Sequence, residues 1–483
     1  MTRDRYPRIA ALKTADAFRA HLASSGIDIP FDDTLAPPAS SPLAQPLDTG
    51  RVRVGNRFCV LPMEGWDGAL DGTPSPLTER RWQRFGTSGA KLIWGGEAVA
   101  VRHDGRASPN QLQINTRTHA AIAGLRDTLV AAHRDHFGAN ADRDLLIGLQ
   151  LTHSGRYAKP NATDRPEPLT AMSHPVLDRR FSSVRMMSDA DIDRLIDDFI
   201  AAAKLAASAG FAFVDVKHCH GYFGHELLGA RSREGKYGGT LDQRSRFLRG
   251  IVDGIRTEVP GLDIGVRLSA FDMVPYRKDA SGEGAPEADA PPPSAAGFGI
   301  VTSDEDLDAA LDDARALLEM LEDMSVRWVC ITGGSPYYCP HAQRPAMFPP
   351  SDGYAPPEDP LRGVARQIDA TARLKADFPG LVIVGSAYSY LQHWLPHVAQ
   401  HVIRHGMADF IGLGRMVLSY PTMAADILAG APLAQKFICR TFSDCTTGPR
   451  LAYTSGCYPL DPFYAARPEA ATILKVRTQA HQK

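Results

Sequence analysis

The sequence predicts an α/β fold, a single (β/α)8 barrel, because short β-branched runs alternate along the chain with amphipathic helical segments. Eight such runs occur, and eight strand–helix units close into a barrel of parallel strands. The predicted strands cover residues 57–61, 91–95, 145–151, 212–217, 263–269, 327–333, 381–385 and 409–414.

Two of the segments between the strands have a clear helical period in their apolar residues. We expect helices over residues 189–210 and 304–321. The second is expected to begin at an N-cap formed by Ser303 or Asp304.

The remaining length predicts extensions and long loops rather than a second domain. We expect an N-terminal extension over residues 1–50, a (β/α)8 barrel domain over 51–432 and a Cys-containing C-terminal extension over 433–483. Long loops, residues 278–299 and 336–360, follow the predicted strands five and six. Both loops leave the strand ends where barrel enzymes build their sites, so we interpret them as lids; disordered decoration is the alternative.

Composition restricts the class of partner. The 483 residues carry a formal charge of -2 with basic and acidic residues interspersed, so no basic stripe indicates nucleic acid or anionic lipid. No apolar run approaches a membrane span, and the N-terminus lacks the apolar core of a signal peptide. We expect a cytoplasmic protein that binds a small molecule and is able to form homo-oligomers.

Polar side chains gather in the segment VDVKHCHGYFGHE, which follows the predicted fourth strand. They are Lys217, His218, His220, Tyr222 and His225. At the carboxyl end of a barrel strand, ammonium, imidazole and phenol groups can polarise a carbonyl group and deliver a proton. Three neighbouring histidines also permit a metal site, although the H-E-x-x-H spacing is absent. A structural role as strand caps is the third interpretation.

Other strand ends carry groups suited to an anionic or heteroaromatic ligand. Gln150 in QLTHSGR offers an amide that both donates and accepts, although a structural role is equally compatible with it. Arg267 lies in the fifth strand, where an inward guanidinium group must be paired or meet an anion. The seventh and eighth strands end in glycine, and Gly414 with Arg415 is suited to holding phosphate.

Five motifs in a fixed order carry a resemblance to a known family. They are NRFCVLPM (56–63), GEAVAVRHDGR (96–106), QLTHSGR (150–156), VDVKHCHGY with KYGGTLDQRSRF (236–247), and ADFIGLGR (408–415). Together they resemble the old yellow enzyme family of FMN-dependent NAD(P)H oxidoreductases, over most of the chain from Asn56 to about Pro432. The resemblance implies a (β/α)8 barrel, FMN as cofactor and NADH or NADPH as hydride donor.

The resemblance also implies roles for individual residues. The implied flavin contacts are Pro62, Met63, Glu64, Ala98, Gln150 and Arg267, and the implied phosphate contacts are Gly385, Ser386, Gly414 and Arg415. Lys217 and His220 stand at the positions that hold a substrate oxygen. Tyr222 stands at the position that protonates the substrate carbon opposite the hydride.

Two residues depart from the family pattern. Lys217 replaces a histidine, or a tyrosine in the amine dehydrogenase branch, and its positive charge predicts a substrate with an acidic or oxyanionic group. Glu64 stands where relatives often carry threonine or cysteine near the flavin N5 and O4 edge. We expect that carboxylate to alter the flavin potential or to contact a cationic substrate.

The C-terminal cysteines depart as well. Relatives of the dienoyl-CoA reductase and trimethylamine dehydrogenase branch bind a [4Fe-4S] cluster through C-x2-C-x3-C-x11-C, and Cys445 with Cys457 keep only the last spacing. Cys439 is displaced from the pattern. We therefore expect no metal, and interpret the three thiols as redox-silent packing groups.

The leading functional hypothesis is reduction of an activated C=C bond by an ene-reductase. Two other hypotheses stay open: FMN-dependent oxidation of an amine or N-methyl group, with Glu64 as the cation contact, and a Schiff-base lyase that uses Lys217. A flavin-binding barrel without catalytic activity is a fourth.

Overall fold

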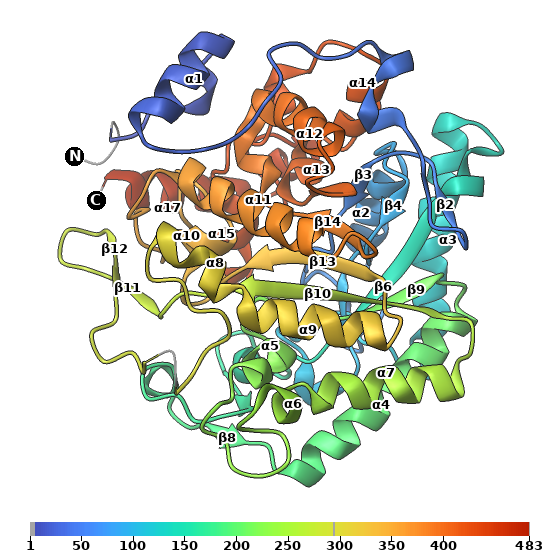
Figure 1. Cartoon of the computed structure of the whole chain (residues 1–483), viewed down its shortest axis with the longest axis vertical. Coiled ribbons are helices and arrows are strands. Elements are labelled where there is room, and N and C mark those ends of the chain that lie inside the picture. Colours follow the sequence, from blue (N-terminus) through green and yellow to red (C-terminus); the bar gives the residue numbers. More distant parts are fainter. Residues whose placement is uncertain (1–4, 293–294, 483) are drawn as a thin grey trace.

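The computed structural model describes residues 5–292 and 295–482, and its centre is a closed barrel of parallel strands (Figure 1). The strand order is β4-β3-β15-β14-β13-β10-β9-β6-β5, and an additional pairing of β4 with β6 closes the ring. The barrel strands are β3 (Phe58–Val60), β4 (Leu92–Ile93), β5 (Ala98–Ala100), β6 (Leu146–Thr152), β9 (Phe213–Val216), β10 (Asp263–Phe271), β13 (Trp328–Gly333), β14 (Val382–Gly385) and β15 (Phe410–Leu413). All eight predicted strands are confirmed. The second barrel strand is divided into β4 and β5, which both pair with β6.

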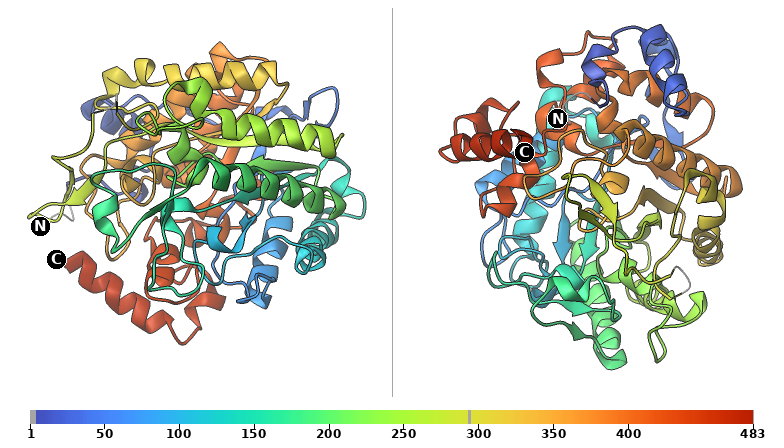
Figure 2. Two further views of the ribbon diagram at one scale, coloured as in Figure 1. Left: turned by 90° about the horizontal axis from the view of Figure 1, so that it is seen from below. Right: turned by 90° about the vertical axis from the view of Figure 1, so that its left-hand side faces the viewer.

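Helices surround the barrel (Figures 1 and 2). The larger ones are α2 (Pro76–Gly86), α3 (His119–Phe137), α4 (Asp189–Ser208), α7 (Arg246–Glu258), α9 (Asp312–Asp323), α11 (Pro360–Asp377) and α12 (Leu395–Arg404). The shorter ones are α5 (Phe223–Leu228), α6 (Leu241–Arg244), α8 (Leu307–Ala310), α10 (Pro340–Gln343), α13 (Arg415–Ser419) and α14 (Met423–Leu428). The predicted helix over 189–210 is confirmed as α4, which begins with a capping box between Ser188 and Asp191.

The prediction of one helix over 304–321 is wrong. A 3-10 turn (Asp304–Asp306) precedes α8, and α9 follows after a break at Leu311. The backbone oxygen of Asp308 accepts the N–H of Leu311 at 3.2 Å, as in a 3-10 turn, and also a hydrogen bond from the guanidinium group of Arg315 at 2.7 Å. Ser303 does precede the first turn, but its side chain makes no capping hydrogen bond.

The terminal segments pack against the barrel. In the N-terminal segment, α1 (Ala15–Ser24) places the ring of Phe18 on Trp394 with centroids 4.8 Å apart. The C-terminal segment forms α15 (Asp444–Arg450), α16 (Pro462–Ala465) and α17 (Ala470–Gln482), with α17 on the outside of the molecule in Figure 2. No helix in the described part of the chain is long and apolar enough to cross a membrane.

Short two-stranded sheets lie outside the barrel. They join β1 (Leu47–Asp48) to β2 (Arg53–Val54), β7 (Leu169–Thr170) to β8 (Arg185–Met186), and β11 (Tyr276–Lys278) to β12 (Gly284–Pro286). The last of these is a hairpin that begins the predicted loop 278–299, so this loop is partly ordered; its residues 293–294 lie outside the described residues.

Aromatic side chains fill the interior of the barrel. Successive residues of a barrel strand point alternately inward and outward, and the inward set forms a cluster separate from the core beneath the helices. In this cluster the ring of Phe213 meets Trp94 at 5.3 Å and Trp328 at 6.1 Å between centroids. Gly148 on the neighbouring strand leaves room for Phe213, because a Cβ atom there would lie 2.3 Å from the ring.

We therefore expect Gly148→Ala to destabilise the barrel by about 1–3 kcal/mol, since Phe213 has no free space into which to move. Gly124→Ala in α3 is the matched control, because a Cβ atom there meets nothing within 4 Å. This control should stabilise the protein slightly, by up to about 1 kcal/mol, through helix propensity. Chemical denaturation followed by circular dichroism measures both. Equal effects of the two substitutions would contradict the close approach of Phe213.

Candidate active site

A cavity of about 960 Å³ opens at the carboxyl ends of the barrel strands. Its walls come from the ends of β6 and β10, from the segments after β3, β6, β9 and β15, from the loop after β13, and from α15. The predicted site residues that line it are Pro62, Met63, Glu64, Gln150, Lys217, His220, Tyr222, Arg267 and Arg415. Residues far apart in the sequence thus meet in one place, as parallel strand ends in a barrel require.

Four other predicted residues lie beside the cavity rather than in its walls. Ala98 is buried at the start of β5, and its carbonyl oxygen accepts a hydrogen bond from Gln111. Gly385 is the last residue of β14 and Ser386 follows it, and Gly414 precedes Arg415 after β15.

Glu64 and Lys217 form a buried ion pair. The Lys217 Nζ atom lies 2.7 Å from Glu64 Oε1, and the two side chains are 4% and 14% exposed. The ammonium group also lies 3.7 Å from the centre of the Tyr222 ring. The two residues that depart from the family pattern are therefore partners of one another, a contact that the sequence did not indicate.

The other oxygen of Glu64 holds the Tyr222 hydroxyl group. Tyr222 donates to Glu64 Oε2 at 2.5 Å, and Trp66 donates its indole N–H to the same oxygen at 3.1 Å. Burial, and then the nearby negative charge of Glu64, raise the pKa of Tyr222 well above 10. The phenol therefore stays protonated across the physiological pH range.

Tyr337, which the sequence analysis missed, extends this network. Its hydroxyl oxygen lies 3.0 Å from that of Tyr222, and its ring stacks on Tyr157 with centroids 3.8 Å apart. Tyr337 belongs to the irregular loop after β13, where no periodicity indicates which side chains face the cavity. The predicted loop 336–360 therefore contributes to the cavity wall.

His220 faces the cavity as a neutral imidazole. Its backbone has a φ of 66° and donates to Ser269 Oγ at 3.0 Å, and its Nε2 atom lies 3.0 Å from Gln343 Nε2. Burial, followed by repulsion from Arg267 and Lys217, lowers the pKa of His220 well below 6.5. The imidazole N–H is thus a hydrogen-bond donor whose charge does not change near neutral pH.

The other histidines of the fourth-strand segment contact the protein itself. His218 Nδ1 lies 3.1 Å from the carbonyl oxygen of Val216, and His225 Nδ1 accepts the backbone N–H of Gly221 at 2.8 Å. Among the described residues, no group of three or more His, Cys, Asp or Glu side chains is arranged to hold a metal ion.

Gln150 and Arg267 are fixed through one buried carboxylate. Asp215 accepts from Gln150 Nε2 at 2.5 Å and from the backbone N–H of Arg267 at 2.6 Å. Burial raises the pKa of Asp215 to about 6, although these hydrogen bonds oppose the rise. The Arg267 side chain is only 5% exposed, yet its Nε atom has no partner in the described residues. A buried, unsatisfied guanidinium N–H indicates a missing acceptor.

Buried polar atoms without a hydrogen-bond partner also occur just after β14 and β15. Ser386 Oγ and Arg415 Nη1 are buried without a hydrogen-bond partner in the described chain, while Arg415 Nη2 donates to the carbonyl oxygen of Pro345 at 2.8 Å. A Cβ atom on Gly414 would meet nothing within 4 Å. Open space beside unpaired donors suits an anionic group.

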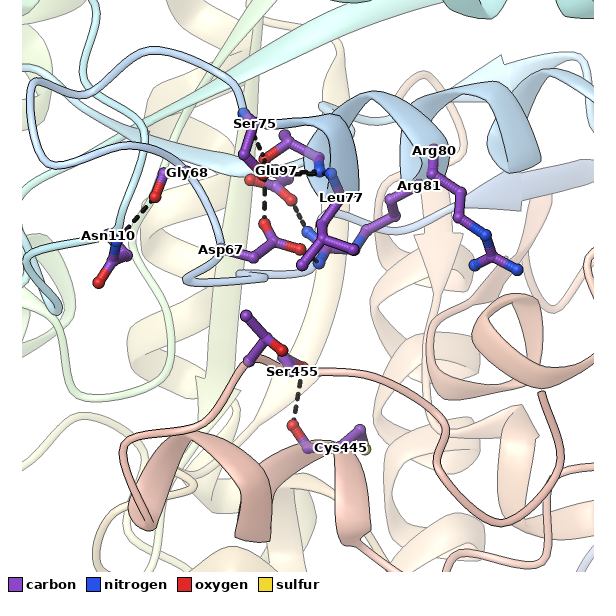
Figure 3. A network of polar contacts seen from close by, with 12 residues as sticks. Asp67, Gly68, Ser75, Leu77, Arg80, Arg81, Glu97, Asn110, Cys445 and Ser455 are labelled. Atoms are coloured by element: carbon purple, nitrogen blue, oxygen red, sulfur yellow. Dashed lines mark hydrogen bonds and ion pairs between the residues drawn. The ribbon is translucent and has the colours of Figure 1, made fainter. Parts of the chain in front are cut away.

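A buried cluster braces the loop that carries Glu64. In Figure 3 the carboxylates of Asp67 and Glu97 both point toward the guanidinium group of Arg81. Asp67 also accepts a hydrogen bond from Thr78 Oγ1 at 3.1 Å. Arg81 leaves no room for a side chain at Gly65, where a Cβ atom would lie 1.7 Å from its Nη1 atom. Of these residues only Glu97 lies in one of the family motifs, so the sequence does not indicate that the three separate segments meet here.

The three C-terminal cysteines gather beside the cavity. Cys439, Cys445 and Cys457 line one small pocket of about 20 Å³ together with Arg415. Cys439 and Cys457 are buried, and Cys445 also lines the main cavity. Burial raises the pKa of both Cys439 and Cys457 above the ordinary value for a thiol. These two thiols are therefore held in the protonated form.

The sequence profile of the NADH:flavin oxidoreductase / NADH oxidase family matches residues 42–288, which is more than half of the chain. The chain belongs to this family. It is 29% identical over 245 residues to a putative 12-oxophytodienoate reductase 3 of Oryza sativa subsp. japonica, covering 48% of this chain and 59% of the relative. It is 34% identical over 181 residues to an NADPH dehydrogenase of Geobacillus sp. (strain WCH70), covering 37% of this chain and 48% of the relative. The alignments span about half the length of these relatives.

Solved structures share the fold. A 2-naphthoyl-CoA reductase in complex with 2-naphthoyl-CoA superposes with a TM-score of 0.63 at 19% identity, covering 89% of this chain and 58% of that one. Histamine dehydrogenase from Rhizobium sp. 4-9 superposes with a TM-score of 0.60 at 20% identity, covering 87% of this chain and 52% of that one. Morphinone reductase superposes with a TM-score of 0.55 at 19% identity, covering 81% of this chain and 91% of that one. These likenesses confirm the (β/α)8 barrel of this family member.

The cavity fits FMN, the flavin of this family. Its volume lies within the range of roughly 300–1,000 Å³ that is usual for small-molecule sites. The unpaired Arg267 Nε atom suits the electron-rich pyrimidine edge of a flavin, and Ser386 with Arg415 suits a phosphate group. The residues present thus match the polar pattern of the cofactor at both ends.

The ion pair between Glu64 and Lys217 yields a stability prediction. Glu64→Gln leaves the Lys217 ammonium group buried without its partner, and should cost about 3–5 kcal/mol of unfolding free energy. Removing both charges, in Glu64→Gln with Lys217→Met, should recover most of that loss. Denaturant unfolding of the two single variants and the double variant forms a mutant cycle. Additive effects would mean that the two charges are not coupled.

Proposed function

We propose that the protein uses NADH or NADPH, through FMN, to reduce an activated C=C bond in a small carbonyl compound. The observation that supports this most is the convergence of Lys217, His220 and Tyr222 on one cavity with Gln150 and Arg267. When bound, FMN supplies the hydride that it has received from the nicotinamide. Alkene reduction adds this hydride to one carbon and a proton to its neighbour, so the protein must supply the proton.

His220 and Lys217 are the groups that polarise the substrate carbonyl in this proposal. A neutral imidazole N–H and an ammonium group both stabilise the negative charge that develops on the oxygen as the hydride arrives. Because Glu64 already matches the charge of Lys217, these side chains favour an uncharged carbonyl over the carboxylate group that the sequence suggested.

Tyr222 is the proposed proton donor. Its O–H bond breaks as the new C–H bond forms, and the ammonium group of Lys217, 3.7 Å from the ring centre, stabilises the phenolate that results. Tyr337, with its hydroxyl 3.0 Å from that of Tyr222, is placed to return a proton. Tyr222 must release its hydrogen bond to Glu64 in this step, because the resting hydroxyl points at that carboxylate.

Oxidation of an amine is the second candidate. The observation in its favour is a carboxylate, Glu64, among aromatic walls formed by Trp66, Tyr157, Tyr222 and Tyr337. The ammonium group of Lys217 weighs against it, because a cationic substrate would have to compete for Glu64. The same ion pair weighs against a Schiff-base role for Lys217, which requires a free, unprotonated amine.

Tyr222→Phe tests the proton donor. We expect a fall in kcat for alkene reduction of about 10²–10⁴-fold, with the rate of flavin reduction by NAD(P)H preserved. Tyr337→Phe should have a smaller effect, because it removes only the group that returns the proton. Since the pKa of Tyr222 lies well above 10, the wild-type rate should not fall between pH 6 and 9 from loss of this proton. Stopped-flow absorbance of the two half-reactions gives these rates, and an unchanged kcat in Tyr222→Phe removes the assignment.

An anaerobic absorbance experiment decides between the two candidates. Purified holoenzyme is mixed with NADH or NADPH, and then with panels of α,β-unsaturated carbonyl compounds; a separate sample of the oxidised holoenzyme is mixed with a panel of amines. Bleaching of the flavin by nicotinamide and recovery with an alkene is the expected result. Bleaching by amines, with no recovery on addition of any alkene, would instead support amine oxidation.

A further inference from the structure

Arg344 is a cationic group in the cavity wall to which the sequence analysis gave no role. It follows α10 in the loop between β13 and α11, and it lines the same cavity as Arg415. Its Nη1 atom donates to Thr446 Oγ1 in α15. Its Nη2 atom is buried and has no hydrogen-bond partner within the described ranges 5–292 and 295–482.

The surroundings of Arg344 are cationic. Burial lowers its pKa to about 9, and repulsion by Arg415 and Arg450 adds to this effect. Asp352 is the neighbouring carboxylate, and it forms an ion pair with Arg450. Two guanidinium groups, those of Arg344 and Arg415, are therefore left without an acidic partner in the described chain. Such an arrangement is costly unless an anion completes it.

The two unmatched groups lie together. Arg415 Nη2 donates to the carbonyl oxygen of Pro345 at 2.8 Å, and Pro345 is the residue that follows Arg344. Each guanidinium group keeps one buried, unpaired Nη atom: Nη2 in Arg344 and Nη1 in Arg415. Two unpaired donors and two unmatched positive charges correspond to one phosphate monoester, which carries about two negative charges and three acceptor oxygens near pH 7.

We propose that Arg344 is a second guanidinium ligand of the flavin phosphate, beside Arg415, and that Thr446 of α15 holds it in place. This inference rests on the flavin cofactor of the family and not on the proposed alkene reaction. It makes the loop after β13 and the C-terminal segment parts of the cofactor site, in addition to the strand ends that carry the family motifs.

Binding of two flavins to the apoprotein tests this role. FMN and riboflavin share the ring system and differ in the phosphate, so a phosphate ligand affects only the first. Arg344→Gln should weaken FMN binding by about 10- to 100-fold, the usual effect of losing a hydrogen bond to a charged group, and leave riboflavin binding unchanged. Quenching of flavin fluorescence measures both dissociation constants. No alkene turnover is needed, so failure of the proposed reaction leaves the measurement intact.

Two further variants sharpen the result. Lys159→Gln removes one positive charge from the wall of the same cavity, and its FMN affinity should stay within about twofold of wild type if local contact rather than general charge decides. Thr446→Val removes the hydrogen bond that orients Arg344, and should weaken FMN binding by a few-fold with riboflavin unaffected. Circular dichroism confirms that each variant is folded.

Three outcomes would overturn the proposal. Equal losses for FMN and riboflavin would make Arg344 a support of the ring or of the fold. An unchanged FMN affinity would mean that Arg344 does not bind the phosphate group and that Arg415 binds it without Arg344. If FMN binding is retained but Arg344→Gln abolishes the spectral shift that benzoate causes in the holoenzyme, with benzamide as the uncharged control, the guanidinium group binds a substrate carboxylate.

Discussion

Parallel pairing of β15 with β3 is the constraint on which the rest of the structure depends. Leu413 pairs with Val60, so the last barrel strand lies beside the first although more than three hundred residues separate them. Ring closure sets all strand ends at one rim, which brings Glu64 after β3 against Lys217 after β9. The aromatic cluster around Phe213 fills the interior below this rim. The cavity therefore forms above a packed barrel interior, and the residues at and after the ends of the strands decide its chemistry.

The ion pair of Glu64 and Lys217 shows how such a rim accommodates unusual residues. Where the family pattern has a neutral residue and a histidine, this chain has two opposite charges, and their contact restores local neutrality. Either change alone would bury an unmatched charge. The carboxylate also accepts a hydrogen bond from Tyr222, and after burial its negative charge contributes to raising the pKa of the proposed proton donor. In the proposed reaction, the groups that bind the substrate oxygen and the proton donor thus belong to one connected set of charges and hydrogen bonds.

Local patterns were sufficient to predict the barrel and part of the site. Each strand is a β-branched run that is legible on its own, and Lys217, His220 and Tyr222 follow the fourth strand directly. The features of the site that the sequence did not predict lie in an irregular loop or depend on a contact between distant positions. Tyr337 and Arg344 lie in an irregular loop, where no period indicates orientation, and the pairing of Glu64 with Lys217 spans 153 positions. The helix predicted over 304–321 is interrupted at Leu311, and the Asp308 carbonyl oxygen there accepts hydrogen bonds from both Arg315 and the backbone N–H of Leu311.

The loop after β13 contacts both ends of the cavity within a few residues. Tyr337 meets Tyr222 at one end, and Arg344 with Pro345 meets Arg415 at the other. The short helix α10 lies between these two contacts along the chain. Thermodynamic coupling is reciprocal, so if a ligand at Arg344 favours the conformation that holds Tyr337, a ligand at Tyr337 strengthens binding at Arg344 by the same factor.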